Sequence, residues 1–408
     1  MRANERTFVK LYPWYVGFTG DLLFYIAIDT LFLSMVKNFS PSQIVSLDSF
    51  SKLICIALQF PILFVIKKIG NTASVRMGAF LLLLSAVFIT VGKNYYLVLI
   101  GRIFHDVAAI FRSASVVALE NNLDLLDKKS DFIRLRTSAN TVYSVITMLI
   151  AFVASYMFNL NPYLPMIGCI TTCTLGFVLS LLMRDCSKYD KIPRSETRGN
   201  VKIAWSKFVV LALLAYFVFF PIVNSGQSEG KLFIQQHLLL AFDKEKTALI
   251  IGAVVCVSRI VRVLSNVIFS KLYEKYQVGM GMILSVLLCL SIGFITFGSF
   301  VTEIAVKIVI MAMGYVIILF VRDPFKLYIQ DVVFEHTAKE QHQTLLAVLE
   351  FGVKIVGACM GLAFSAILVG YPMVTVMLIL YAVSVIEILL CLRLYRIVWV
   401  EKKQKSVS

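Results

Sequence analysis

The 408-residue sequence has few charged residues and only one sizeable hydrophilic stretch. Only 15% of the residues are Asp, Glu, Lys or Arg, whereas soluble proteins carry about a quarter. Hydrophobic residues make up 59% of the chain, and apolar runs repeatedly reach the roughly 20 residues that a helix needs to cross a bilayer. This composition excludes a soluble globular domain and predicts an all-α integral membrane protein.

Signatures of enzymes are also missing. The sequence contains no HExxH, P-loop or GxSxG motif, and no loop is long enough to hold a catalytic domain. Cys169 and Cys173 lie one helical turn apart without a nearby His or acid in sequence, so we interpret them as small apolar helix residues. We therefore expect no enzymatic activity, no cofactor, no bound metal and no disulfide framework.

The N-terminal apolar segment is predicted to be a membrane helix rather than a removed signal peptide, because no A-x-A-like cleavage site follows a short apolar region. Twelve such segments lie at about 11–36, 43–66, 73–92, 95–119, 137–158, 164–183, 207–238, 247–271, 278–299, 303–327, 344–369 and 372–397. The seventh is long and polar near Asn224–Gly226, so we expect it to be broken or bent there.

An even number of spans places both termini on one side of the membrane. If that side is cytoplasmic, most Lys and Arg are cytoplasmic, and the external ones are Lys37, Lys93, Lys244 and Lys246. The positive-inside rule therefore predicts cytoplasmic termini, and we expect a multi-pass protein of a bacterial cytoplasmic membrane. Anionic inner-leaflet lipids explain the net charge of +15 without a nucleic-acid partner.

The hydrophilic stretch 184–206 separates residues 1–183 from residues 207–408. The two halves resemble each other weakly: Arg112 aligns with Arg322, and the same register aligns Asn140 with Glu350. We therefore predict two pseudo-symmetric six-helix bundles joined by a basic cytoplasmic linker. Such internal repeats are typical of secondary transporters with a site between the halves.

Two segments carry a resemblance to a known family. In Leu99-Ile-Gly-Arg-Ile-Phe-His-Asp, Arg102 follows a glycine, and residues 67–76 include Gly70 and a trailing Arg76. In these features the chain resembles the major facilitator superfamily, which implies twelve helices, alternating access and conformational roles for Gly70, Arg76 and Arg102. Lys67-Lys68 stand where the family usually has Asp-Arg, and this departure weakens the gating role of the loop. The fifth span also lacks the Gly-Pro element of the family's drug–proton antiporters.

Ionisable residues inside membrane spans are candidates for function because their burial is costly. The candidates for proton coupling are Asp21, Asp29, His105, Asp106 and Glu229. On a continuous helix, the first two would lie about 80° apart and face the same cavity. His105 neighbours a carboxylate and titrates near neutral pH when unperturbed. The alternative is that these groups are fixed counter-ions or satisfied polar residues.

Further residues are candidates for solute binding or gating. Arg112 and Arg322 suit a carboxylate or phosphate, but inward-gate salt bridges are an equal alternative. Near them, Asp323 is a binding or gating candidate and Pro324 a conformational one. Other candidates are Lys52, Arg259 and Arg262 near the outer mouth, Asn224 and Gln227 in the seventh span, and Asn140 and Glu350.

The location of the eleventh- and twelfth-span acids is also predicted. Glu350 either faces the position of Asn140 or pairs with Lys354, and Glu387 is expected to be peripheral.

The residues favour a secondary active transporter that works as a monomer by alternating access. It would couple protons, or another cation, to movement of a small polar, anionic or zwitterionic organic solute across the bilayer. One alternative is efflux of amphiphilic drugs or lipids. Another is a non-transporting membrane sensor or scaffold.

Overall fold

The computed structural model describes residues 7–126, 128, 131–183, 206–276, 279–337 and 342–405. These residues form helices joined by short turns, with no strand among them. The chain divides into two compact units: unit 1 is Met1–Phe39 with Phe50–Arg198, and unit 2 is Ser40–Ser49 with Gly199–Ser408. The predicted linker 184–206 lies outside the described residues, apart from Ser206, and stays a prediction.

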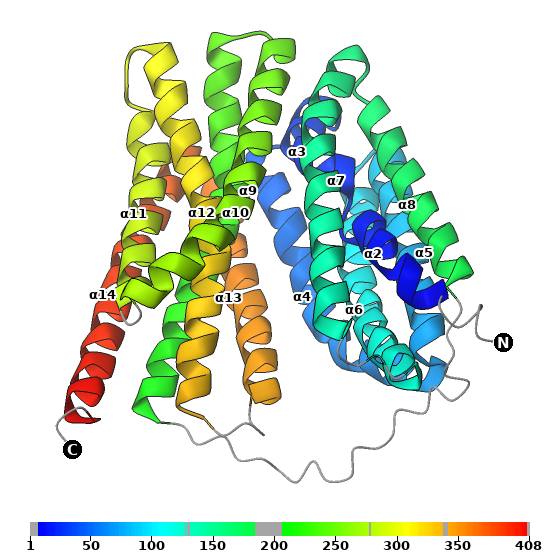
Figure 1. The fold of residues 1–408 in the computed structure, drawn as a ribbon. Helices are drawn as coiled ribbons and strands as arrows, with labels where there is room; N and C mark the ends of the chain where they lie inside the picture. The colour runs from blue at the N-terminus through cyan, green and yellow to red at the C-terminus, as the bar shows by residue number, and fades with distance from the viewer. Residues whose placement is uncertain are drawn as a thin grey trace. The chain divides into compact units, whose positions relative to one another are not determined.

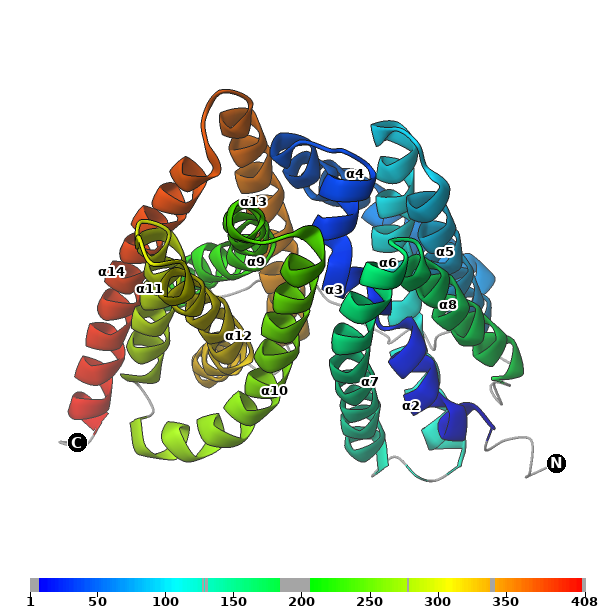
Figure 2. The same cartoon turned by 90° about the horizontal axis from the view of Figure 1, so that it is seen from above.

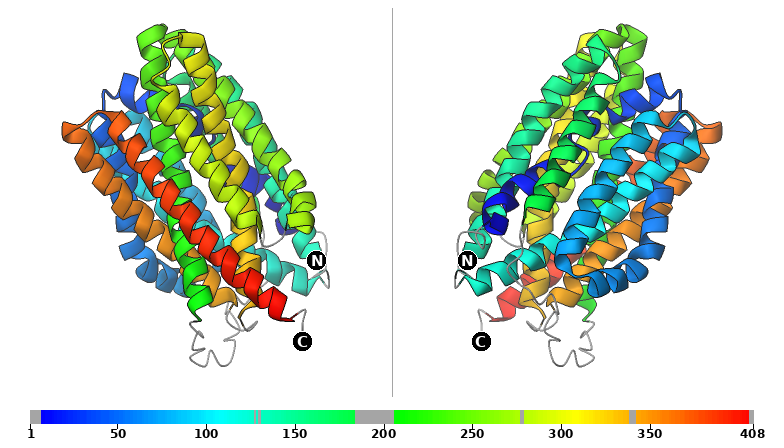
Figure 3. Two further views of the ribbon diagram at one scale, coloured as in Figure 1. Left: turned by 90° about the vertical axis from the view of Figure 1, so that its left-hand side faces the viewer. Right: turned by 90° about the vertical axis from the view of Figure 1, so that its right-hand side faces the viewer.

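Unit 1 is built from helices that each bury one face against a neighbour. They are α2 (Thr7–Thr19), α3 (Leu23–Leu31), the π-helical turn η1 (Phe32–Val36), α4 (Pro41–Ile69), α5 (Asn71–Val91), α6 (Tyr95–Leu125), α7 (Phe132–Leu160) and α8 (Leu164–Leu182). The first residues of α4 are grouped with unit 2. Within unit 1, α5 and α6 lie side by side (Figures 1 and 3).

The first apolar span is interrupted. Its helix ends at Thr19 and resumes at Leu23, so Asp21 lies in non-helical backbone. The expectation of one continuous helix is therefore wrong, and so is the 80° relation between Asp21 and Asp29 that depended on it. The interruption leaves backbone groups without helical partners. One of them, the Leu22 N–H, donates a hydrogen bond to the Asp21 carboxylate at 2.8 Å.

The turn between α4 and α5 depends on a glycine. Gly70 is the one residue separating the two helices, and its φ of 86° is a conformation that side chains disfavour. This geometry fits the conformational role that the family resemblance implies for the 67–76 segment. Arg76 follows in the second turn of α5, and its buried Nε has no hydrogen-bond acceptor among the described residues.

Lys37 closes the other end of α5. Its Nζ donates to the carbonyl oxygens of Thr90 and Gly92, at 2.7 and 2.8 Å, and lies 5.0 Å from the centre of the Phe32 ring. The cation thus satisfies carbonyls that the end of a helix leaves unpaired. Burial lowers the pKa of Lys37.

Unit 2 is organised around its first helix. Its helices are α9 (Lys207–Ala241), α10 (Lys244–Tyr276), α11 (Met280–Gly298), α12 (Ile304–Glu335), α13 (His342–Gly370) and α14 (Met373–Lys405). Within this unit α9 contacts every other helix, and Figure 2 shows it among them. A helix in this position must be apolar on most of its circumference, which explains why its sequence shows little amphipathic patterning.

Helix α9 is continuous through Asn224–Gly226, so of the two expectations for this segment, a break or a bend, the break is wrong. Pro221 lies inside it without ending it, and the polar run 224–229 keeps helical geometry. Gly226 allows the close packing of α9, because a Cβ there would lie 2.8 Å from Ile318 and 2.9 Å from Ile292. An interruption of this kind occurs instead in the first span, between Thr19 and Leu23.

Eleven of the twelve predicted spans qualify as membrane helices by length and composition alone, counting Thr7–Val36 as one. The exception, α6, carries Arg102, Asp106 and Arg112 along its central part. Large apolar side chains are exposed on the outer helices, including Phe60 and Phe64 of α4, which are 74% and 71% exposed. Such apolar surfaces require a lipid environment. The chain is a multi-pass integral membrane protein.

A close helix contact in unit 2 gives a stability test. A Cβ at Gly314 of α12 would lie 2.5 Å from the Ser291 carbonyl oxygen of α11, and neither backbone can move aside cheaply. We expect Gly314→Ala to destabilise the protein by about 1–3 kcal/mol in thermal unfolding of the purified protein. The matched control is Gly357→Ala in α13, where nothing lies within 4 Å of the added Cβ. Equal melting temperatures for the two variants would contradict this packing.

Candidate functional site

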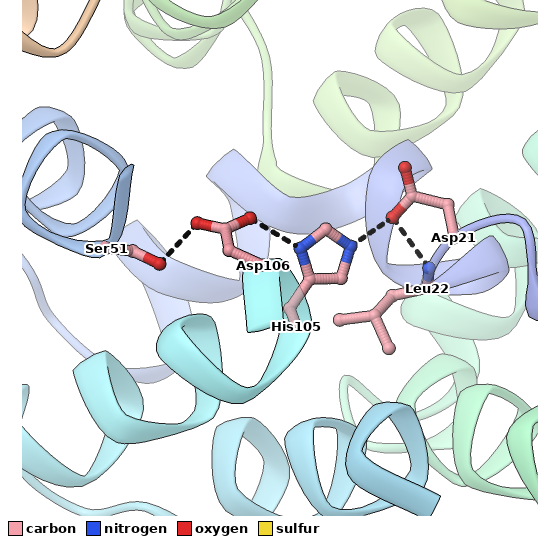
Figure 4. A network of polar contacts seen from close by, with 5 residues as sticks. All are labelled: Asp21, Leu22, Ser51, His105 and Asp106. Carbon is pink, nitrogen blue, oxygen red and sulfur yellow. Dashed lines mark hydrogen bonds and ion pairs between the residues drawn. The ribbon is translucent and has the colours of Figure 1, made fainter. Parts of the chain in front are cut away.

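A chain of polar contacts runs through unit 1, centred on His105 of α6 (Figure 4). The Nε2 atom of His105 lies 2.7 Å from Oδ1 of Asp21, and Nδ1 lies 3.1 Å from Oδ1 of Asp106. The other carboxylate oxygen of Asp106 accepts a hydrogen bond from the Ser51 hydroxyl of α4. We call Asp21, Ser51, His105 and Asp106 the His105 cluster.

Each member of the His105 cluster is positioned by its backbone. The interruption between α2 and α3 presents Asp21, while consecutive positions on α6 supply His105 and Asp106. Asp21 is the most exposed member: its side chain is 33% exposed, those of His105 and Asp106 are 13% and 18% exposed, and Ser51 is fully buried. The cluster therefore leads from an accessible carboxylate into the interior of unit 1.

The His105 cluster can exist in more than one protonation state without losing a hydrogen bond. An imidazolium donates from both nitrogens, one to each carboxylate, which gives the three ionisable groups a net charge of −1. A neutral imidazole has one donor and one acceptor, so it satisfies both contacts only if one carboxyl is protonated. These two forms hold the same number of protons and carry a net charge of −1. Uptake of one further proton gives a neutral cluster. This arrangement is suited to taking up and releasing protons.

Two arginines flank the cluster. Arg102 lies within electrostatic range of His105, and Arg112 within range of Asp21. The side chain of Arg112, on α6, packs against α5 at Gly78, where an added Cβ would lie 2.8 Å from the Arg112 Cγ. Its Nη1 is buried and has no hydrogen-bond acceptor in the described part of the chain. A buried guanidinium donor without an acceptor is costly and invites an acceptor from outside the protein.

The other unit 1 candidates lie on α3, α4 and α7. Asp29 lies in α3, where its Oδ1 accepts the Thr30 N–H at 2.6 Å. Lys52 is half-buried on α4, next to Ser51, and Asn140 is exposed on α7. The contacts that define the His105 cluster include none of these three.

Unit 2 contains a paired arginine. Arg262 of α10 donates to both oxygens of Asp323 of α12, from Nε at 2.7 Å and from Nη2 at 3.0 Å. The two side chains are 29% and 26% exposed. A bidentate pair of this kind fixes the register of the two helices and leaves little of Arg262 available to an anion. Arg259, on the same helix, is half-buried.

A second arginine of α12 reaches α9. Arg322 donates from Nη1 to Oε1 of Gln227 at 3.0 Å. The amide Nε2 of Gln227 is buried and lacks an acceptor among the described residues. Two residues further along α9, Glu229 is buried and accepts a hydrogen bond from the Ser228 hydroxyl. Asn224 lies half-buried one turn before Ser228 and accepts its hydroxyl through the backbone carbonyl, at 3.1 Å.

Two further candidates from the sequence lie in unit 2. Pro324 lies inside α12 without ending it, although its missing N–H still removes one helical hydrogen bond. Glu350 forms an ion pair with Lys326 of α12, at 3.7 Å, rather than with Lys354. This contact ties α13 to α12 within unit 2.

Two polar residues in the structure were not singled out from the sequence as site residues. Ser51 belongs to the His105 cluster, and a buried serine in an apolar span carries no pattern that announces it. Glu387 was expected to be peripheral and is fully buried in unit 2. Its i+4 neighbour Cys391, which contacts it, was the only sequence signal for an inward-facing position.

The structure forms two pockets within single units whose described linings contain no candidate residue. One, of about 500 Å³, is apolar and lies among α11, α12 and α14, lined by Leu290, Gly293, Phe294, Phe297, Gly298, Val301, Ile310, Met313 and Tyr381. Within the described ranges, no group of three His, Cys, Asp or Glu side chains is placed to hold a metal ion.

Comparison with known proteins gives matches in structure but not in sequence. No protein-family model matches the chain, and no curated protein matches it significantly. A mutant of the nucleoside transporter NupG superposes with a TM-score of 0.76 over 95% of this chain and 99% of that chain, at 11% identity. A bacterial homologue of the iron transporter ferroportin, in an inward-facing state, matches with a TM-score of 0.69 over 97% and 99%, at 11% identity.

A third match is a POT family transporter in complex with 5-aminolevulinic acid, with a TM-score of 0.68 over 97% of this chain and 96% of that chain, at 10% identity. The chain has the fold of a major facilitator transporter. The fold that residues 67–76 and Arg102 suggested is thus confirmed, and at these identities the likeness concerns the major facilitator fold alone.

Proposed function

We propose that this chain is a proton-coupled secondary active transporter that moves a small polar solute by alternating access. The observation that carries the proposal is the His105 cluster. A titratable group bridging two carboxylates inside a membrane unit is costly to build, and such residues mark proton and ion pathways in transporters. The partly exposed Asp21 would exchange protons with water, and His105 would pass them to Asp106.

We infer the solute class from donors that the protein leaves unmatched. In unit 1 the Arg112 Nη1 is a buried donor, and in unit 2 the Gln227 Nε2 is another. Both require hydrogen-bond acceptors, which favours an anionic or zwitterionic organic solute over an amphiphilic cation. The structural neighbours include a nucleoside transporter and a transporter in complex with 5-aminolevulinic acid, which bears both an amine and a carboxylate, and these support a small polar solute.

The proposed coupling follows from charge. Binding an anion beside Arg112 changes the field at Asp21, because the guanidinium acts electrostatically on that carboxylate. Partial neutralisation of Arg112 makes the negative form of Asp21 less favourable, and proton uptake by the His105 cluster becomes easier. Proton and anion would therefore bind together and cross together. The Lys and Arg distribution supports an orientation with both termini in the cytoplasm.

The proposal is tested by reconstituting the protein into liposomes that enclose a pH-sensitive dye. We expect a panel of monocarboxylates, dicarboxylates, amino acids and phosphate esters to contain a solute whose addition moves protons. The signal should be absent from protein-free liposomes and should collapse with a protonophore. Its amplitude should depend on the solute gradient, because coupled transport exchanges one gradient for the other.

The panel also separates the competing functions. Proton movement driven only by amphiphilic cations or lipids would replace the proposal with efflux. Solute movement without proton movement would contradict the proposed coupling and support transport alone. Binding without movement of any panel member would favour a sensor or scaffold and contradict the proposal.

A further inference from the structure

A buried acid outside the His105 cluster lies in unit 2. Glu387 of α14 is 0% exposed and lies near the middle of the span that ends at Ile397. One of its oxygens, Oε1, is 3.2 Å from the Cys391 thiol, one turn along the same helix. That thiol accepts a hydrogen bond from the Ser285 hydroxyl of α11 at 3.1 Å. The contacts join α14 to α11 through one acid, one thiol and one hydroxyl.

Among the described residues, no cation forms an ion pair with Glu387. Its second oxygen, Oε2, is buried and has no hydrogen-bond partner among the described residues. The titratable groups facing it are the Cys391 thiol on its own helix and, beyond that thiol, the Tyr328 hydroxyl of α12. The α11 contact is a neutral serine, and within the described part of α9, α11, α12 and α13 no cation forms an ion pair with it.

A carboxylate in this position would be a buried charge with a single weak donor. Burial of an unpaired ion is so costly that such groups bind a proton instead. A protonated carboxyl removes the charge and fits the same space, and either the acid or the thiol can donate between Oε1 and the sulfur. We propose that Glu387 is a proton-binding site that stays occupied at neutral pH and holds α14 against α11 as a neutral acid.

This site differs from the His105 cluster in what protonation does. The cluster has an accessible carboxylate and changes protonation state at little loss of hydrogen bonding, whereas Glu387 has no exposed atom and no alternative partner. Its proton is therefore resident, and its loss at alkaline pH should separate α14 from α11. The test needs no knowledge of the transported solute.

Infrared spectroscopy and thermal unfolding of the purified full-length protein test the proposal. At about pH 7 we expect a protonated-carboxyl carbonyl band that Glu387→Gln removes and that Glu303→Gln, at an exposed position, leaves in place. Between about pH 7 and about pH 10, the wild-type melting temperature should fall by roughly 4 °C more than that of Glu387→Gln. The glutamine variant is neutral and nearly the same size, so it should fold.

The same measurements can overturn the proposal. Identical infrared spectra of wild type and Glu387→Gln would show an ionised Glu387 and overturn the proposal. Cys391→Ala gives a second route to the same answer. Because it removes the thiol contact, it should shift the carboxyl band without abolishing it, and an unchanged band would assign the signal to another acid.

Discussion

Replacing His105 with glutamine is expected to reduce solute-driven proton movement at least about a hundredfold, the scale on which removal of a positioned proton-transfer group acts. Glutamine has similar reach: its amide NH₂ can donate to one carboxylate, and its oxygen can accept from the other when that carboxyl is protonated. It cannot accept a proton. The variant therefore separates the architecture of the His105 cluster from its ability to carry charge.

The measurement is the initial rate of dye response in proteoliposomes, with solute binding followed separately. We expect binding to persist in His105→Gln, because the proposed anion contact is Arg112 rather than the imidazole. The matched control is His336→Gln, since His336 lies at the end of α12 and its Nδ1 contacts the Val332 carbonyl at 2.8 Å. Wild-type coupling in His105→Gln, with the usual proton-to-solute ratio, would show that protons take another path.

Much of the fold was predictable from the sequence because hydrocarbon thickness imposes span length. Eleven spans are recovered by length and apolar composition, and the twelfth, α6, was found from its apolar run despite its charges. The predicted spans also give the depth of each candidate residue along its helix, to within about one turn. What the apolar pattern could not show is where a helix is interrupted, since Gly20–Leu22 and Asn224–Gly226 both combine a glycine with polar residues.

The choice between these two segments is made by tertiary packing. In α9 the polar run lies on the most enclosed helix of unit 2, and Gly226 packs against Ile292 and Ile318, which holds it helical. In the first span, Asp21 obtains partners outside the helix, the Leu22 N–H and the His105 ring. The interruption is therefore stabilised by a residue 84 positions away, which no local pattern contains.

The residues of the candidate site were predicted only in part, because their mutual contacts also depend on tertiary packing. Asp21, His105 and Asp106 were selected as buried ionisable residues, and the structure brings these three together. Sequence reasoning could not decide which acids share a partner, so Asp29 and Glu229 were grouped with them. Ser51 was missed because buried hydroxyls are common in membrane helices and gain meaning only from a neighbouring charge.

Replacing Arg112 with methionine is expected to weaken solute binding while leaving stability unchanged or improved. Methionine keeps the apolar stem that packs at Gly78, and it removes a buried donor that has no acceptor in the described structure. Loss of a hydrogen bond to a charged group corresponds to about 1.5–3 kcal/mol, so the solute Kd should rise about tenfold to a hundredfold. Removal of an unmatched donor carries no stability loss of that kind.

The contrast is Arg262→Met in unit 2. Arg262 makes two hydrogen bonds to Asp323, and its loss leaves that carboxylate half-buried without its partner. We expect this variant to lower the melting temperature, by an amount moderated by the partial exposure of the pair. Arg112 and Arg262 are both arginines inside membrane units, so the two substitutions remove the same atoms from different environments. If Arg112→Met is destabilised like Arg262→Met and binds solute normally, then Arg112 stabilises the fold, and the proposal that it contacts the anion is contradicted.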